Sequence, residues 1–359
     1  MMSDMTSRER LRKTLRRQEP DRVPRLEICH WPETLLRWRR EGLPADQTPN
    51  AFFGFDGLCM AYLDGSLQLP PQTLEDGPDY TLARDRDGIV RQAWKSNYAP
   101  PADVDHLLKT RDDWAAHRHR LAPTPDRIPA GLAETIGAAQ ARGQFVTLSP
   151  PEPVWWVLRA LGMEEALPVM ALDPEWFREM VTAQADLVYE LCRQVFAGAE
   201  RPDAVWFFAD LCYRNGMLFS PALYREMVLA QHRRIADLCH AHDVSLIIHC
   251  DGYVGEFIPL LIEAGVDCIQ PLEARAGNDV RQLKPLYGDR LSFFGNMNMD
   301  VFATGDLEAI EAEVSSKVTA AMPGGGYIYH SDHSVPPTVS FAAYRHAAEV
   351  AKRVGRYGG

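Results

Sequence analysis

The stretch SLIIHCDGYVGEFIPLLIEAGVDCIQPLE, residues 245–273, contains one complete strand–helix–strand unit. It opens with an apolar run at 245–249 and returns to a second apolar run at 267–270. Between these runs, residues 254–264 have the apolar spacing of a helix and end at Gly265, a residue type that commonly terminates helices. Two buried strands joined by one helix over this distance predict a parallel βαβ crossover.

The same alternation extends along most of the chain. Further apolar runs typical of buried strands lie at 22–28, 145–148, 205–208, 291–294 and 327–330. Helical patterns cover 173–199, 220–242, 306–321 and 340–354, and no dinucleotide-binding glycine motif follows the first strand. We therefore predict an α/β fold, a (β/α)8 TIM barrel that spans residues 1–359 as one domain. We also expect a helical extension at the N-terminus and a small β excursion at 70–101, where the pattern changes.

Composition restricts the class of protein. Hydrophobic residues make up 46% and charged residues 24%, as in globular proteins with a large core. The chain has no apolar run near the roughly 20 residues that span a bilayer, and its first residues are polar, so we expect a cytoplasmic protein. Seven scattered cysteines predict reduced thiols rather than a disulfide framework. The net charge of −11 argues against nucleic acid or an anionic membrane surface as partner.

Acidic and imidazole side chains follow several of the predicted strands. They are Asp210, His249, Asp251, Glu273, Asp332 and His333. In a TIM barrel the carboxyl ends of all strands meet at one mouth, so we expect these groups to converge there. Because side chains alternate along a strand, His249 and Asp251 should point the same way and Cys250 the opposite way. Polar strand ends that merely bond to neighbouring loops would give the same pattern.

Imidazole and carboxylate groups are both good zinc ligands. We therefore take His249, Asp251, Glu273 and His333 as candidate metal ligands. Tyr213 and Arg214, just after Asp210, are candidates for binding an anionic part of a substrate, although Arg214 would equally suit a loop anchor. Asn296 and Asn298 follow another strand and should either orient a substrate oxygen or cap the next helix.

Three further segments resemble the uroporphyrinogen decarboxylase-like superfamily. They are residues 6–10 followed by Glu-Pro-Asp-Arg-Val-Pro at 19–24, the stretch 210–225 with Ser220-Pro221, and His-Cys-Asp-Gly at 249–252 leading into 261–267. The resemblance covers nearly the whole chain and implies a TIM barrel. It also implies a homodimer, as relatives with this barrel commonly form. The superfamily contains cofactor-free decarboxylases and zinc-binding methyltransferases that use a corrinoid or a thiol.

The chain departs from the pattern of the true decarboxylases. Those proteins carry an arginine-rich segment soon after the first strand, which binds the carboxylates of the porphyrinogen, whereas this chain has Leu-Glu-Ile-Cys-His-Trp-Pro at 26–32. An acidic Glu27 in that place would repel such a substrate. The thiol methyltransferases, in turn, have cysteines where this chain has Asp251 and the segment Ser-Asp-His at 331–333. These harder ligands favour an oxygen- or nitrogen-bearing substrate over a thiol.

The sequence therefore predicts a zinc-dependent methyltransferase acting on a small O- or N-methylated substrate. Asp210 or Asp332 would protonate the departing oxygen or nitrogen. The chain has no motif like Asp-x-His-x-x-Gly of corrinoid carriers, so the methyl acceptor would be a corrinoid on a partner protein. Two alternatives remain at this stage: a metal-free decarboxylase or lyase of a small acid that uses Asp210, and a barrel that only binds a small molecule.

Overall fold

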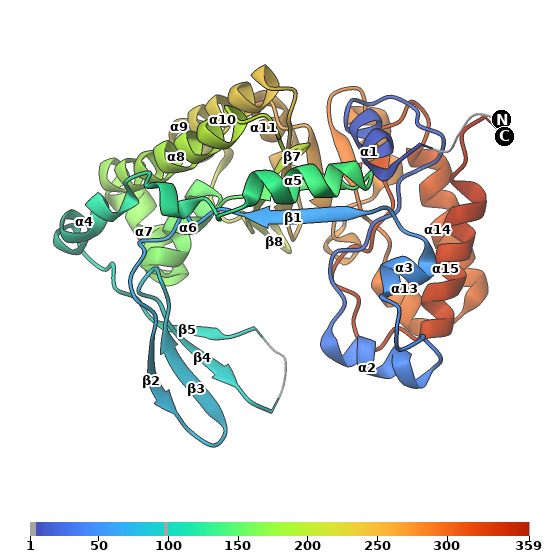
Figure 1. Cartoon of the computed structure of the whole chain (residues 1–359), viewed down its shortest axis with the longest axis horizontal. Coiled ribbons are helices and arrows are strands. Elements are labelled where there is room, and N and C mark those ends of the chain that lie inside the picture. Colours follow the sequence, from blue (N-terminus) through green and yellow to red (C-terminus); the bar gives the residue numbers. More distant parts are fainter. Residues whose placement is uncertain (1–4, 97–99, 359) are drawn as a thin grey trace.

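The computed structural model describes residues 5–96 and 100–358, and its centre is a curled sheet of parallel strands. The strands follow the chain order from one edge to the other and are β1 Leu58–Tyr62, β6 Phe145–Ser149, β7 Ala204–Phe208, β10 Ser245–Cys250, β11 Cys268–Pro271, β12 Ser292–Phe294 and β13 Tyr327–Ile328. Figure 1 shows this sheet at the middle of the molecule, with helices outside it. All strands predicted from residue 145 onward are present, whereas β1 was not predicted.

The predicted strand at 22–28 is not a regular strand, although it occupies the place of one. Arg25 forms a parallel bridge with Tyr329, directly after β13, and the Arg25 carbonyl accepts a bond of 2.7 Å from Asp56 N, just before β1. The ladder stays short because Pro24 has no N–H and because Arg25 N donates to the Asp56 side chain instead of a strand. The segment nevertheless lies between the two edges of the curled sheet, so the TIM-barrel prediction is confirmed.

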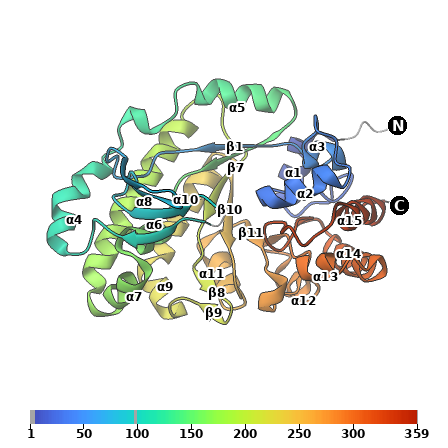
Figure 2. The same cartoon turned by 90° about the horizontal axis from the view of Figure 1, so that it is seen from below.

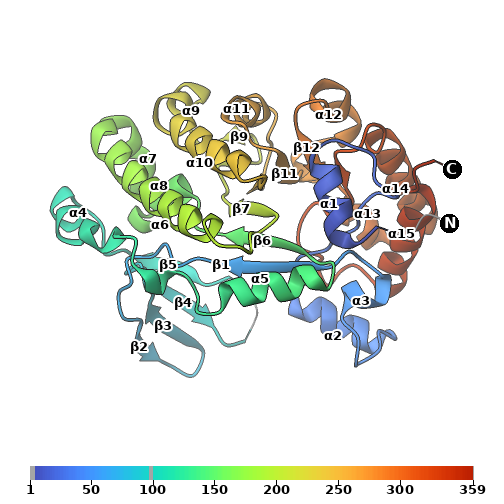
Figure 3. The same ribbon diagram turned by 45° about the horizontal axis from the view of Figure 1, so that its top comes forward.

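Helices cover the outside of the barrel, as Figure 3 shows. They are α5 Leu132–Ala141, α6 Pro153–Leu161, α7 Met163–Leu172, α8 Pro174–Phe196, α9 Pro221–Met227, α10 Leu229–Ala241, α11 Phe257–Ala264, α12 Val280–Tyr287, α14 Leu307–Ala321 and α15 Phe341–Val354. The helix predicted at 220–242 is divided in two at Val228. Ser220 and Ser340 accept backbone N–H bonds at the starts of α9 and α15, which explains why those helices begin where they do.

The barrel interior is a packed core. Leu26, Phe145, Trp206, Ile247, Cys268, Phe294 and Ile328 form one buried cluster there. Leu11 and Leu15 of the N-terminal helix α1 (Ser7–Leu15) belong to the same cluster and close the barrel at its amino end. Arg8 and Arg12 of α1 both bind the buried carboxylate of Asp203, which precedes β7. The amino end is therefore sealed, and the mouth lies at the carboxyl ends of the strands.

The predicted N-terminal extension and β excursion are both present. The extension consists of α1, α2 (Pro32–Arg40) and α3 (Pro49–Phe53). The excursion is an antiparallel sheet that projects from the barrel in Figure 1, made of β2 Gln72–Asp76, β3 Tyr80–Arg84, β4 Val90–Trp94 and β5 Ala102–Asp105. The helix α4 (Arg111–His117) follows the excursion along the chain. None of the helices in the described part of the chain has an apolar stretch long enough to cross a membrane.

Candidate metal centre

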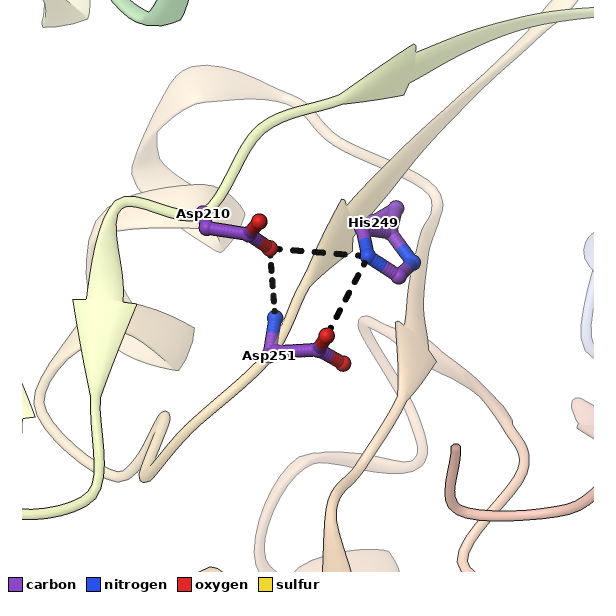
Figure 4. Close-up of side chains that lie close together, drawn as sticks. All are labelled: Asp210, His249 and Asp251. Atoms are coloured by element: carbon purple, nitrogen blue, oxygen red, sulfur yellow. Dashed lines mark hydrogen bonds and ion pairs between the residues drawn. The ribbon is translucent and has the colours of Figure 1, made fainter. Parts of the chain in front are cut away.

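Two neighbouring strands bring an acidic and imidazole cluster to the barrel mouth. The strands β7 and β10 lie side by side (Figure 2). Asp210 follows β7, while His249 lies near the end of β10 and Asp251 directly after it (Figure 4). His249 is two residues beyond Ile247, which belongs to the interior cluster, so the alternation of the strand directs His249 inward at the next level up. Cys250 is fully buried on the other face, as the alternation predicts.

The spacing of the three side chains suits a metal ion. His249 Nε2 lies 3.5 Å from Asp210 Oδ1 and 3.8 Å from Asp251 Oδ2. One ligand atom from each residue lies within 4.8 Å of the others. Ligand atoms that share a tetrahedral zinc ion, with bonds of about 2.0–2.2 Å, lie about 3.3–3.6 Å apart. A small contraction of the cluster would therefore bring all three into the coordination sphere of one ion.

The orientation of the His249 ring also suits metal binding. Its Nδ1 lies 2.6 Å from the amide oxygen of Gln270, which is buried and stands opposite His249 in the β10–β11 pair. An amide oxygen only accepts, so Nδ1 carries a proton toward Gln270, and Nε2 is the ring nitrogen that faces the two carboxylates and would coordinate a metal when deprotonated. Metal-binding histidines are commonly held by a second hydrogen bond of this kind.

The charges of the cluster are not balanced. Burial raises the pKa of Asp210, but the contact with His249 and its charge outweigh burial and lower it overall. Burial also raises the pKa of Asp251, and since the Asp210 charge adds to this effect, the net shift is upward despite His249. Asp251 Oδ1 is buried and has no hydrogen-bond partner among the described residues. A cation at this point would neutralise the excess negative charge and supply the missing partner.

The other two predicted ligands are placed differently. His333 Nε2 lies 3.6 Å from Asp251 Oδ2, so His333 and His249 lie beside the same carboxylate oxygen. Glu273 is turned away: its Oε2 accepts from Gly252 N and its Oε1 pairs with Arg275 Nε. Of the predicted ligands, the structure therefore groups His249 and Asp251 with His333 beside them. Asp210, predicted as a proton donor, takes the place expected for Glu273.

The carboxylate of Asp332, a predicted proton donor, is bound by backbone N–H groups. Both oxygens of Asp332 accept N–H bonds, from Ala274 and from Met299, and its side chain is buried. This arrangement holds loops together and does not support the predicted proton transfer by Asp332.

Asn296 contradicts the expectation that it faces the mouth. It is completely buried, donates to the carbonyls of Leu272 and Asn278, and accepts from Val280 N. Both of its amide hydrogens and one lone pair of its amide oxygen are therefore used by loops, so its side chain holds loops together and does not face the mouth. Asn298 caps the short helix α13 (Met299–Thr304) through its bond from Asp300 N, which was the alternative considered for it.

Tyr213 and Arg214 lie in a short hairpin beside the cluster, formed by β8 (Cys212–Tyr213) and β9 (Gly216–Met217). Gly252 has φ +85°, and a Cβ atom there would lie 2.6 Å from the Tyr213 backbone, so glycine is required at the contact between hairpin and site. Both side chains are exposed. Their role in substrate binding stays a prediction.

Glu27 does not reach the mouth, which corrects the expectation that it repels an anionic substrate. It is 2% exposed and accepts hydrogen bonds from Ser331 Oγ and Tyr344 Oη, both at 2.9 Å. Sequence reasoning also missed two neighbours of His249, namely Gln270 and Phe208. Both stand opposite His249 in the strand pairs, so the sheet register would have identified them.

The chain is thus an α/β-barrel protein with a carboxylate–imidazole cluster at the mouth of the barrel. A family model described as uroporphyrinogen decarboxylase (URO-D) matches residues 158–354. The chain belongs to this family. No significant match was found among curated proteins.

Solved structures resemble the chain in fold. A methyltransferase from Methanosarcina mazei has a TM-score of 0.64 and 12% identity, over 98% of this chain and 99% of that protein. Xylanase B from Clostridium stercorarium F9 has a TM-score of 0.35 and 13% identity, over 60% of this chain and 76% of that protein. At these identities the first likeness supports the fold alone, and the second is too weak to support an argument.

Proposed function

We propose that this protein is a metal-dependent methyltransferase that removes a methyl group from a small O- or N-methylated substrate. The observation that supports it most is the cluster of Asp210, His249 Nε2 and Asp251, with one buried Asp251 oxygen lacking a partner among the described residues. These three residues would hold zinc, with His333 next in reach. A bound zinc ion supplies Lewis-acid polarisation of the substrate heteroatom.

The donor set favours oxygen and nitrogen substrates over thiols. Two carboxylates and an imidazole are harder ligands than the thiolates of a thiol-activating site. The nearest cysteine in sequence, Cys250, is buried, and its thiol donates to the Asp251 carbonyl at 3.4 Å. It therefore faces away from the cluster.

We assign proton delivery to the departing heteroatom to His333. With Asp210 in the ligand set and Asp332 bound to two backbone donors, His333 is the group beside the centre that combines partial exposure with proton-transfer chemistry. Gln270 holds the His249 ring in position. The methyl acceptor would be a reduced corrinoid on a partner protein, and we expect the chain to act as a homodimer, which light scattering would test.

Elemental analysis tests the metal. Protein purified without chelator should contain near-stoichiometric zinc, and His249→Ala should reduce it below about a tenth of an equivalent. His240→Ala is the matched control, because His240 lies on the surface of α10 and pairs with Asp267. Equal zinc in the two variants would refute the ligand assignment.

A methyl-transfer assay tests the reaction. Cob(I)alamin incubated with the protein and a panel of methyl ethers and methylamines should be converted to methylcobalamin, and the His249→Ala variant should be inactive. Uroporphyrinogen should not be decarboxylated, because the segment 26–28 carries no arginine. Coproporphyrinogen formation at enzymatic rates would instead identify a true decarboxylase. Metal-free protein that decarboxylates a smaller acid, with Asp210 essential, would support the alternative of a cofactor-free lyase.

A further inference from the structure

A largely apolar cavity, wide open to solvent, adjoins the candidate metal centre. It measures about 380 Å³ and is lined by Tyr62, Leu63, Ser149, Pro150, Pro151 and Phe208. These residues stand at or just after the carboxyl ends of three adjacent strands, β1, β6 and β7. Its volume falls within the range of small-molecule sites, about 300–1,000 Å³.

Phe208 joins this cavity to the metal centre. Its ring centroid lies 5.2 Å from that of His249, and the two residues stand opposite each other in the β7–β10 pair. Phe208 also stacks on Trp206 with an interplanar angle of 19°. The ring is therefore held by two aromatic neighbours, and a flat ligand lying against Phe208 would be one side chain away from His249.

The cavity wall also contains a hydroxyl group without a partner. Ser149 is 6% exposed, and its Oγ is buried with no hydrogen-bond partner in the described part of the chain. Thr147 Oγ1, two residues earlier in β6, is also buried and unpartnered. Thr147 stands opposite Ala204, a member of the interior cluster, so both hydroxyls belong to the inward face of β6. A buried hydroxyl without a partner is unfavourable, so Ser149 points to a ligand oxygen.

Tyr62 completes the cavity at its rim. It is 59% exposed, although large aromatic side chains usually lie inside a protein. The consecutive prolines at 150 and 151, which follow Ser149, contribute a rigid part of the wall. A second cavity beside the centre, lined by Trp31, Arg275, Asp332 and His333 among others, measures only about 120 Å³, below the range of about 300–1,000 Å³ usual for small-molecule sites.

We infer that the cavity of Tyr62, Ser149 and Phe208 binds the body of the substrate, a planar apolar molecule that bears an oxygen bonded to Ser149 Oγ. A methylated oxygen or nitrogen on the edge next to Phe208 would then face His249. The orientation toward His249 rests on the proposed function, whereas binding of the planar body does not.

Binding of three small probes tests the inference. Phenol has a ring and a hydroxyl, toluene has the ring alone, and cyclohexanol has the hydroxyl on a non-planar body. We expect phenol to bind most tightly, as measured by calorimetry and by saturation-transfer NMR on the purified full chain. The result should be the same after chelator treatment.

Three variants connect binding to the cavity. Tyr62→Ala should weaken phenol binding about 10-fold, because the phenol ring loses its contact with the tyrosine ring. Ser149→Ala should weaken phenol about 5-fold and leave toluene unchanged, because only a hydrogen bond is lost. Leu286→Ala removes an equally exposed apolar side chain from α12 and should change the affinity for neither phenol nor toluene.

Failure of this inference and failure of the proposed function would give different results. Absence of phenol binding, or phenol binding that neither Tyr62→Ala nor Ser149→Ala weakens, would overturn the inference even if zinc and methyl transfer are found. Phenol binding with the expected variant pattern, in a protein without zinc, would uphold the cavity and reject the proposed function. Should Ser149→Ala fail to fold, Tyr62→Ala still decides, since Tyr62 is exposed.

Discussion

Two histidine–carboxylate clusters lie at strand ends of this barrel, and they differ in how completely their hydrogen bonds are made. In the first, His330 Nε2 lies 2.9 Å from Glu27 Oε1, and Glu27 also accepts from Ser331 and Tyr344. In the second, His249 stands 3.5 Å from Asp210 and 3.8 Å from Asp251, and Asp251 Oδ1 has no partner among the described residues.

The electrostatics follow the same division. Burial raises the pKa of Glu27, but the charge and hydrogen bond of His330 outweigh it and bring the pKa down to about 2. The pKa of Asp251 is shifted upward instead, because burial and the nearby Asp210 oppose its ionisation. The Glu27 cluster therefore compensates its own charge, whereas the Asp251 cluster keeps a carboxyl with a raised pKa and an oxygen without a partner among the described residues. A histidine next to a carboxylate does not by itself indicate a functional site. The two clusters differ in whether a buried carboxylate oxygen lacks a hydrogen-bond partner among the described residues.

The largest effect on stability is expected at Glu27. Glu27→Ala should lower the free energy of unfolding by about 3–5 kcal/mol, because it leaves the buried His330 and Tyr344 without their partner. Urea titration would measure this, with Glu349→Ala, an exposed carboxylate, as the control. Any folded fraction should still bind metal. A loss below about 1 kcal/mol would show that the Glu27 cluster is not structural.

Gln270 tests how the open cluster is held. Gln270→Leu should weaken zinc binding 10–100-fold, the usual effect of removing a hydrogen bond to a metal-binding histidine. Competition with a chelating dye would measure the affinity, and circular dichroism would check the fold. Unchanged affinity would mean that His249 is not oriented by Gln270 or is not a ligand.

Asp87 tests the same reasoning away from the mouth. Its Oδ1 accepts from Leu67 N and Trp156 Nε1, yet burial raises the pKa of Asp87 to about 6. Because the folded-state pKa is raised, the carboxyl stabilises the fold below the ordinary value of 3.8, and this stabilisation is lost as the pH rises through about 6.

Asp87→Asn should therefore raise stability at pH 8 by about 1–2 kcal/mol, less than the full value of such a shift because part of the side chain is solvated. Thermal melts from pH 8 to pH 4 would show the gain shrinking as Asp87 becomes protonated in the parent protein. A gain that does not depend on pH would contradict this origin.

The smallest effect concerns repulsion within the open cluster. In metal-free protein, Asp251→Asn should raise the free energy of unfolding by about 0.5–1 kcal/mol, because it removes one of two neighbouring carboxylate charges. The control is Asp289→Asn, which changes a carboxylate with 77% side-chain exposure. With zinc present, Asp251→Asn should instead lower the free energy of unfolding, because the variant loses a metal ligand. Destabilisation in both states would argue against a cation site.

Local patterns explain what could be predicted from the sequence. The β10–α11–β11 unit was predictable because a helical apolar pattern that ends at Gly265 separates two strand-like runs, and the alternation in β10 correctly separated His249 from Cys250. The strand β1 was missed because Leu-Cys-Met-Ala-Tyr contains no β-branched residue and is only partly buried.

The errors at the site arose from contacts distant in sequence. Asp332 receives its donors from residues 58 and 33 positions away, and Glu27 meets Tyr344 across 317 positions. Asn296 turns inward because its backbone has φ +76°, which an extended pattern does not reveal. Strand-end position thus identified which polar residues to consider, and only tertiary packing determined which of them keep free valences.

The seal at the amino end of the barrel has a consequence for the order of assembly during synthesis. Helix α1 leaves the ribosome early, yet Leu11 and Leu15 pack against residues as late as Phe294 and Ile328. Its apolar face therefore stays without its final neighbours until most of the chain has been translated. We expect nascent chains stalled before residue 290 to expose α1 to proteases, and those stalled well beyond β13 to protect it.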